Sequence, residues 1–266
     1  MSTNDTDDLA AAKAGYRSRF GRFSPSMGWK AFWSEIIIVI LGVLIALAAN
    51  EAVQNWNWQN KVRNSEVRLR GDLEYAFEMG AESIVVAPCV DAQLVAMANN
   101  LLKDGNALQA LPRYSDKAFQ DYVVRYPDRP FVFPVWDALV ADGTVTHIPE
   151  ARQKAYQEIN KSLSESNFKN SESTRSRGRF AVMAYPIALD TVVRKDLLIE
   201  IEEQRSRYKS ITLGSKQAMQ QIDNLHMAPK PETVVVSLQD SGTVSFCKAH
   251  GYPLADWRDA LKPEAR

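Results

Sequence analysis

Two cysteines and two histidines are the residues whose side chains could together bind a metal ion. Cys247 and His250 stand three positions apart and would share one face of a helix, whereas Cys89 and His226 lie far from them in the sequence. Two thiolates and two imidazoles form a common kind of structural zinc site. Nothing in the spacing brings His226 to the others, and two cysteines in an oxidising compartment usually pair. We therefore predict a disulfide between Cys89 and Cys247, with a metal site or two buried free thiols as the alternatives.

The disulfide would have a structural purpose. Cys89 follows Pro88 at the start of a predicted helix, and Cys247 lies in a short C-terminal segment with little apolar periodicity. The bridge would hold that segment on the rest of the fold, and a loop of this length corresponds to about 5 kcal/mol in the chain-entropy estimate. Because disulfides persist in oxidising compartments, this prediction places the domain outside the cytoplasm.

Common catalytic patterns are absent from the sequence. It contains no G-x-S-x-G, Walker A, G-x-G-x-x-G or H-E-x-x-H motif. Glu200, Glu202 and Glu203 alternate with apolar residues as on the solvated face of a helix, and His147 is expected at the surface before a helix start. The 32 basic and 32 acidic residues cancel, which argues against a nucleic-acid partner. We predict no catalytic residues, no cofactor and no enzymatic activity.

The elements that would position these residues begin with a membrane segment. Residues 36–49 include no polar side chain, yet this run would rise only about 21 Å in a helix, against about 30 Å for the hydrocarbon core of a bilayer. Trp33 and Trp56 flank it about 34 Å apart, which matches the two aromatic belts. Glu35 would lie at the membrane edge, the alternative being a functional carboxylate within the membrane. We predict a transmembrane helix in the lipid bilayer.

The fate and direction of this helix are less constrained. Ala46-Leu47-Ala48 is typical of a signal-peptidase site, so cleavage after Ala48 stays open, although an n-region of 35 residues ending in Glu35 would be unusual. A short basic N-terminal tail resists translocation, whereas long domains cross regardless of charge. We therefore expect a retained helix in the bacterial inner membrane, with the N-terminus in the cytoplasm and the C-terminal domain in the periplasm.

Small residues recur along this helix. Gly42, Ala46 and Asn50 are four positions apart and define a face on which a second helix could approach closely. The spacing predicts self-association or contact with a partner through the membrane helix.

The same segment resembles a known family. Trp33-Ser34-Glu35, the apolar run up to Asn50, and then Asn55-Trp56-Asn57 are similar to an uncharacterised bacterial family of single-pass membrane proteins. The N-terminal helix of that family reads approximately E-I-x-L-I-V-x-G-I-L-I-A-L-x-x-N-x-W-N. The chain departs from it in the four residues 51–54, which precede Asn55-Trp56. The resemblance implies a single-pass topology and a helical extracytoplasmic domain, and it carries over no catalytic residue.

Apolar spacing predicts helices through most of the remaining chain. A stalk continuing from the membrane should break at 86–88, because proline disrupts a helix interior. Further helices are expected over 90–101, from Ser115 to Tyr126, from Pro134 to Gly143, from Pro149 onward, and over 191–225 with Gly214 as a weak point. Residues 162–179, with six serines and three arginines, fit either a loop or a polar helix. The β-branched run 233–238 predicts a short extended piece.

The predicted fold class is therefore all-α, with at most one short extended piece near the C-terminus. The predicted organisation is a flexible cytoplasmic tail (1–28), a transmembrane helix with aromatic flanks (29–58), and a stalk with an extracytoplasmic helical domain (59–266). The favoured function is a non-enzymatic, membrane-anchored scaffold or accessory protein that binds another envelope component. The alternatives are a ligand-sensing domain that signals through a membrane partner, and an enzyme of unrecognised type.

Overall fold

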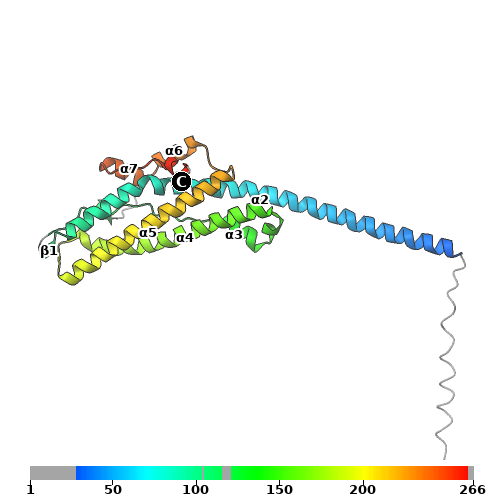
Figure 1. The fold of residues 1–266 in the computed structure, drawn as a ribbon, viewed down its shortest axis with the longest axis horizontal. Coiled ribbons are helices and arrows are strands. Elements are labelled where there is room, and N and C mark those ends of the chain that lie inside the picture. Colours follow the sequence, from blue (N-terminus) through cyan, green and yellow to red (C-terminus); the bar gives the residue numbers. More distant parts are fainter. Residues whose placement is uncertain (1–27, 104, 116–120, 263–266) are drawn as a thin grey trace, which may run out of the picture. The chain divides into compact units, whose positions relative to one another are not determined.

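The computed structural model describes residues 28–103, 105–115 and 121–262, and it is mostly helical (Figure 1). The helices are α2 (Trp29–Leu101), α3 (Pro134–Ala141), α4 (Glu150–Phe180), α5 (Thr191–Asn224), α6 (Pro231–Gln239) and α7 (Gly242–Ala249), and the 3-10 turns are η1 (Thr144–His147), η2 (Ala181–Ala184) and η3 (Trp257–Leu261). The predicted all-α class is confirmed. The predicted cytoplasmic tail falls outside the described residues except for Gly28.

The chain divides into two compact units, Met1–Asn57 and Trp58–Arg266. The first contains the apolar part of α2, where every residue from Ile37 to Leu47 is exposed. Among the described residues, one helix is long and apolar enough to cross a membrane, and it is the helix that contains this segment. This criterion concerns length and composition alone, and a signal sequence would also meet it.

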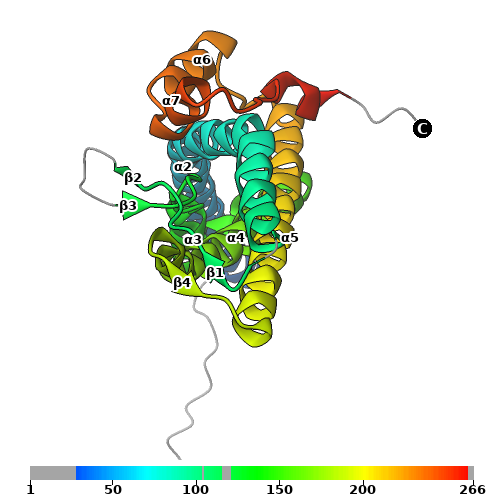
Figure 2. The same ribbon diagram turned by 90° about the vertical axis from the view of Figure 1, so that its left-hand side faces the viewer.

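The second unit is built around three long helical segments, which are the C-terminal part of α2, α4 and α5 (Figures 1 and 2). The helices α6 and α7 lie over α2, on the side away from α3 and α4. The core is apolar, and its fully buried side chains include Leu73, Phe77, Leu94, Tyr156, Ile159, Ile201 and Ile222. Burial of these side chains is the main favourable term for the bundle.

Pro88 does not end the helix, so the predicted break at 86–88 is wrong. The helix continues to Leu101 with Pro88 in its interior. A proline removes one helical hydrogen bond and crowds the carbonyl four residues before it. Here the backbone N–H of Ala255 donates to the carbonyl oxygen of Val85, at 2.9 Å, so that the C-terminal segment provides a hydrogen bond next to the disturbed turn.

An arginine from another helix satisfies carbonyls at the C-terminal end of α2. The guanidinium of Arg194 in α5 donates to the carbonyl oxygens of Leu101, Lys103 (3.0 Å) and Gly105 (2.5 Å). The last carbonyls of a helix have no partner within the helix, and a cation near them also complements the helix dipole. The predicted end of this helix at residue 101 is confirmed, whereas Asp104 lies outside the described residues.

The polar stretch 162–179 is helical and forms the second half of α4. Its buried polar positions are Ser166, Asn170, Ser173 and Ser176, at spacings of three and four. Ser166 and Ser176 lie against α5, and their small size allows the two helices to approach closely. A Cβ atom at Gly214 of α5 would lie 2.5 Å from the Ser166 hydroxyl oxygen. Of the two interpretations left open by the sequence, the polar helix is therefore the one observed.

A helix is predicted from Ser115 to Tyr126, and this prediction is wrong for the residues that the structure describes. Residues 116–120 lie outside the described residues. Ser115 belongs to β2 (Tyr114–Ser115), which pairs with β3 (Asp121–Tyr122), and the chain then runs without helix to Phe133. Side-chain amides satisfy its backbone: Gln93 donates to the carbonyl oxygen of Arg125 (3.0 Å) and accepts from its N–H (2.8 Å). Asn170 likewise donates to the carbonyl oxygen of Arg129 (3.0 Å). These amides replace the partners that a helix would supply.

The extended piece predicted over 233–238 is also wrong, because these residues form α6. Pro231 occupies the first turn, and Val234 is fully buried, so packing overrides the β-propensity of the valines. The remaining strands are β1 (Ala107–Leu108) and β4 (Ile187–Ala188), which pair antiparallel. The helices predicted from Pro134, from Pro149 and over 191–225 are confirmed as α3, α4 and α5.

Candidate functional site

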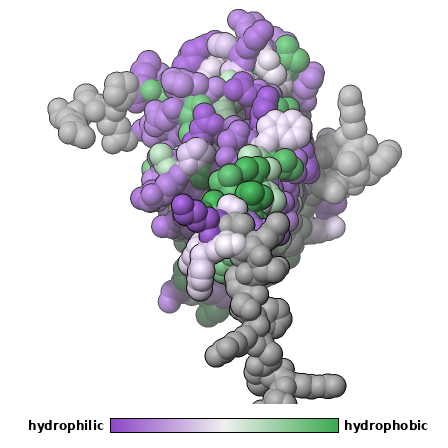
Figure 3. Space-filling view, turned by 90° about the vertical axis from the view of Figure 1, so that its right-hand side faces the viewer, coloured by the Kyte–Doolittle hydropathy of each residue, from purple (hydrophilic) through white to green (hydrophobic). Residues whose placement is uncertain are grey.

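The residues predicted at the membrane segment are all solvent-exposed in the structure. Trp33 and Trp56 are 54% and 63% exposed, and Glu35 is exposed as well. Gly42, Ala46 and Asn50 lie on the same helix at intervals of four, and a Cβ at Gly42 would meet no atom within 4 Å. Figure 3 views the molecule from the side on which α2 begins, and hydrophobic side chains gather near the centre of that view. Such a concentration is typical of a surface that contacts lipid or protein.

Cys89 and Cys247 form a disulfide, as predicted, with their Cα atoms 6.0 Å apart. Both side chains are fully buried. The bond fastens α7 to α2 across 158 residues of sequence. Since the two sulfurs bond to each other, neither is a thiolate, and the alternative Cys2His2 zinc site loses both sulfur ligands.

Further contacts hold the C-terminal segment on α2. Ser241 caps α7 by accepting from the N–H of Val244, and its hydroxyl donates to the buried carboxylate of Glu82 at 2.5 Å. The Nε atom of Arg129 lies 3.8 Å from the other oxygen of Glu82. The Phe77 and Trp257 rings meet edge to face, with centroids 5.9 Å apart. The carboxylate of Glu82 is thus a structural group inside the fold.

The histidines lie apart from one another. His147 stacks on Trp58 with ring centroids 3.9 Å apart and is exposed, as predicted. His226 follows α5 with a positive φ of 55°, and its carbonyl oxygen accepts from Arg70. His250 is exposed and joins an aromatic cluster in which Tyr114 lies 4.9 Å and Phe246 4.3 Å from its ring. Within the described ranges, no group of three or more His, Cys, Asp or Glu side chains could hold a metal ion.

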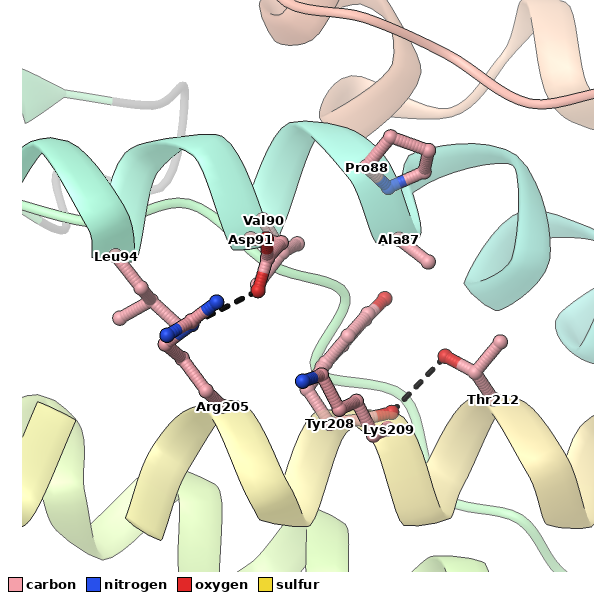
Figure 4. A pocket seen from close by; sticks show the side chains of 9 residues that line it. All are labelled: Ala87, Pro88, Val90, Asp91, Leu94, Arg205, Tyr208, Lys209 and Thr212. Carbon is pink, nitrogen blue, oxygen red and sulfur yellow. Dashed lines mark hydrogen bonds and ion pairs between the residues drawn. The ribbon is translucent and has the colours of Figure 1, made fainter. Parts of the chain in front are cut away.

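A cavity of about 290 Å³ lies between α2 and α5 beside Pro88 (Figure 4). Its walls are mostly apolar, and the bend of the α2 ribbon at Pro88 lies directly above it. The lining side chains are those of Ala87, Pro88, Val90, Asp91, Leu94, Arg205, Tyr208, Lys209 and Thr212. A proline in a helix interior displaces the turn before it, and the space below that turn is open here.

An ion pair closes one end of this cavity. Nε of Arg205 lies 2.9 Å from a carboxylate oxygen of Asp91, and Nη1 of the same guanidinium donates to both oxygens of Glu202. Hydrogen bonds to these two carboxylates raise the pKa of Arg205. The Tyr208 hydroxyl donates to the carbonyl oxygen of Ser83 at 3.4 Å, and burial raises the pKa of this tyrosine well above its usual value. Arg205 and Tyr208 are therefore fixed groups of the wall, charged and neutral respectively at physiological pH.

A second hollow lies on the outer surface between α4 and α5. It measures about 520 Å³, and its rim includes Phe168 and Leu213, which are 60% and 56% exposed. Lys169 and Glu165 also line it. Large exposed apolar side chains beside a hollow are typical of surfaces that bind other molecules.

The buried carboxylate of Glu200 joins the C-terminal end of α4 to the N-terminal part of α5. Glu200 accepts from the Ser176 hydroxyl and from Arg179, both at 2.5 Å, and Nη1 of Arg207 lies 3.3 Å away. Burial by itself raises the pKa of this carboxyl, but these hydrogen bonds outweigh it and lower the pKa below its usual range. Glu200, Glu202 and Glu203 are predicted to form a solvated face. This prediction is wrong for Glu200, which is buried.

Sequence reasoning missed both cavities and the Glu200 cluster. Asp91 and Arg205 are 114 residues apart, so no local spacing joins them. The apolar repeat in α5 marked its core face, but it did not reveal that Pro88 would open a space opposite Tyr208. Comparisons with protein-family profiles, with characterised proteins and with solved structures found no match for the chain.

Proposed function

We propose that this chain is a membrane-anchored, non-enzymatic scaffold or accessory protein, a member of the single-pass family that its N-terminal helix resembles. Its helical domain lies in the periplasm, its short N-terminal tail in the cytoplasm, and the anchor is retained in the inner membrane. The domain binds another component of the cell envelope.

The continuity of α2 is the observation that carries this proposal. One helix contains the exposed apolar segment and, further along, the buried core residues Leu73, Phe77 and Leu94 of the bundle. A leader that is cleaved off does not require a helix that continues into the domain core. An anchor that positions a domain requires such a helix. The buried disulfide supports an oxidising compartment. The hollow beside Phe168 and Leu213 supports a binding role for the domain surface.

Two reporters fused after Arg266 test the topology. A phosphatase that is active only in the periplasm should be active there, and a fluorescent protein that folds only in the cytoplasm should stay dark. The opposite pattern would refute the orientation. N-terminal sequencing of the mature protein tests whether the anchor is retained. A sequence that begins at Ala49 or Asn50 would refute retention.

Site-specific photocrosslinking in native membranes tests the binding role. A photoreactive residue at Phe168 should give one adduct of defined mass, and the adduct should disappear when Leu213→Lys is added. The matched control is the same photoreactive residue at Val236, an exposed apolar position on α6, where no such adduct is expected. Absence of the adduct, or an adduct with only twice the mass of the chain, would contradict a heterologous partner.

A ligand-sensing domain is the second candidate, and the cavity beside Pro88 favours it. The cavity is lined by α2, the same helix that contains the apolar segment. A ligand that binds there would contact the helix leading to the membrane, so its occupancy could be passed to a membrane partner.

A further inference from the structure

We propose that the cavity between α2 and α5 binds a small amphipathic carboxylate, with its hydrocarbon part inside the cavity and its carboxylate on Lys209. This site is independent of the partner-binding role proposed above. The volume of about 290 Å³ is at the lower end of the range for ligand pockets, which suits a small molecule and excludes a whole phospholipid.

The walls determine the apolar part of the ligand. Ala87, Pro88, Val90 and Leu94 of α2 line the cavity, and Ala87 lies across it from Tyr208 while Leu94 lies across it from Arg205 (Figure 4). The two hydroxyl groups of the wall are already engaged. Thr212 donates its hydroxyl to the carbonyl oxygen of Tyr208 at 2.9 Å, and the Tyr208 hydroxyl donates to Ser83. A ligand inside the cavity therefore meets carbon surface.

The charges determine the polar part of the ligand. Three charged side chains line the cavity, and two of them, Asp91 and Arg205, pair with each other at 2.9 Å. Lys209 forms no hydrogen bond or ion pair with the part of the chain that the structure describes, and it is solvent-exposed. Arg205 is also engaged by Glu202, so Lys209 is the available cation. A single lysine provides one point charge, which suits a monoanion better than a phosphate dianion.

The test uses the full-length protein in lipid nanodiscs, with empty nanodiscs as the background. The probe is 3-phenylpropionate, which has one ring and one carboxylate and dissolves readily in water. Ligand-observed NMR titration should show saturable binding to the wild type. The uncharged analogue 3-phenylpropanol should bind about tenfold more weakly, because it cannot form the charge-assisted contact.

Two variants separate the parts of the site. Lys209→Met keeps the aliphatic stem and should weaken binding of 3-phenylpropionate about tenfold while leaving 3-phenylpropanol unchanged. Ala87→Leu fills the cavity and should abolish binding of both probes. Lys195→Met removes an exposed lysine elsewhere on α5 and is the matched control, with no effect expected.

Thermal unfolding of each variant checks that its fold is intact. Lys209 is exposed, so its replacement leaves the fold intact even if Ala87→Leu does not fold. Absence of saturable binding, or equal binding by the wild type and Lys209→Met, would overturn the proposal. Equal affinity for the acid and the alcohol would show a cavity that selects apolar molecules without regard to charge, which also overturns it.

Discussion

Substitution of Gly214 by alanine should destabilise the domain, although alanine is the better helix former. Gly214 lies inside α5, and a Cβ added there would meet the Ser166 hydroxyl oxygen at 2.5 Å and the Ser162 carbonyl oxygen at 3.4 Å. The first distance is shorter than any real contact of a Cβ atom. Ser166 is itself buried, so its side chain has little space to move away.

The net effect follows from two opposing terms. Replacing glycine by alanine inside a helix stabilises by about 1 kcal/mol. Overpacking of a buried contact destabilises by about 1–3 kcal/mol. We expect a net loss of about 1 kcal/mol, which corresponds to a melting temperature about 2–4 °C lower for a domain of this size.

A double-mutant cycle identifies the cause. In Gly214→Ala with Ser166→Ala, the clashing oxygen is absent, and the nearest remaining atom of residue 166 lies 3.9 Å away, which is an ordinary contact. The double variant should regain the stability lost in Gly214→Ala, and the coupling energy should be about 1–3 kcal/mol. Denaturant unfolding of the full-length protein, followed by circular dichroism, measures all four corners of the cycle.

Gly71 is the matched control for this cycle. It is an exposed glycine inside α2, and a Cβ there would meet nothing within 4 Å. Gly71→Ala should therefore stabilise by about 1 kcal/mol. If Gly214→Ala stabilises to the same extent, or if the cycle shows no coupling, the close approach of α4 and α5 at this point is refuted.

Three further predictions concern contacts that hold the bundle together. Replacing Cys89 and Cys247 by alanine should lower the free energy of unfolding by up to about 5 kcal/mol, and an unchanged denaturant midpoint would contradict the stabilising role of the bridge. Arg194→Ala should destabilise by about 1–3 kcal/mol through loss of the carbonyl contacts at the end of α2, and a fully stable Arg194→Lys variant would show that charge alone suffices. The lowered pKa of Glu200 means that its contribution to stability is complete above the ordinary carboxyl pKa and is lost as the pH falls through the folded-state pKa. Unfolding midpoints between pH 6 and pH 3 should therefore fall more steeply for the wild type than for Glu200→Gln, and parallel curves would contradict this assignment.

Local signals in the sequence were sufficient for the main helices. Pro134 and Pro149 occur at helix starts, where a missing N–H is harmless, and the apolar repeat of α5 outweighs the unfavourable Gly214. The disulfide was also predictable, because a chain with two cysteines has one way to pair them. These features depend on a few neighbouring residues or on composition alone.

Features that depend on distant partners were predicted wrongly. The segment that ends at Tyr126 has helical spacing, yet the amide of Gln93 in α2 pairs with the backbone of Arg125 as a neighbouring strand would. Pro88 predicts a break, yet helix packing on both sides of it and the hydrogen bond from Ala255 to Val85 preserve the helix. The valines of α6 predict a strand, yet one of them, Val234, is needed in the core. In each case a tertiary contact outweighs a local preference.

The two ends of the α4–α5 pair differ in the interactions that stabilise them. Near the start of α4, Tyr156 and Ile159 are fully buried, and each large apolar side chain contributes about 1.5–3 kcal/mol. Near its end, small polar residues are buried beside the fully buried Phe180, and a hydrogen bond contributes only about 0.5–1.5 kcal/mol net. This polar end is where Glu200 joins Ser176, Arg179 and Arg207, and where Arg194 a few residues away holds the end of α2. Charge-assisted contacts therefore add to the apolar burial of Phe180 and Ile201 at this end of the bundle.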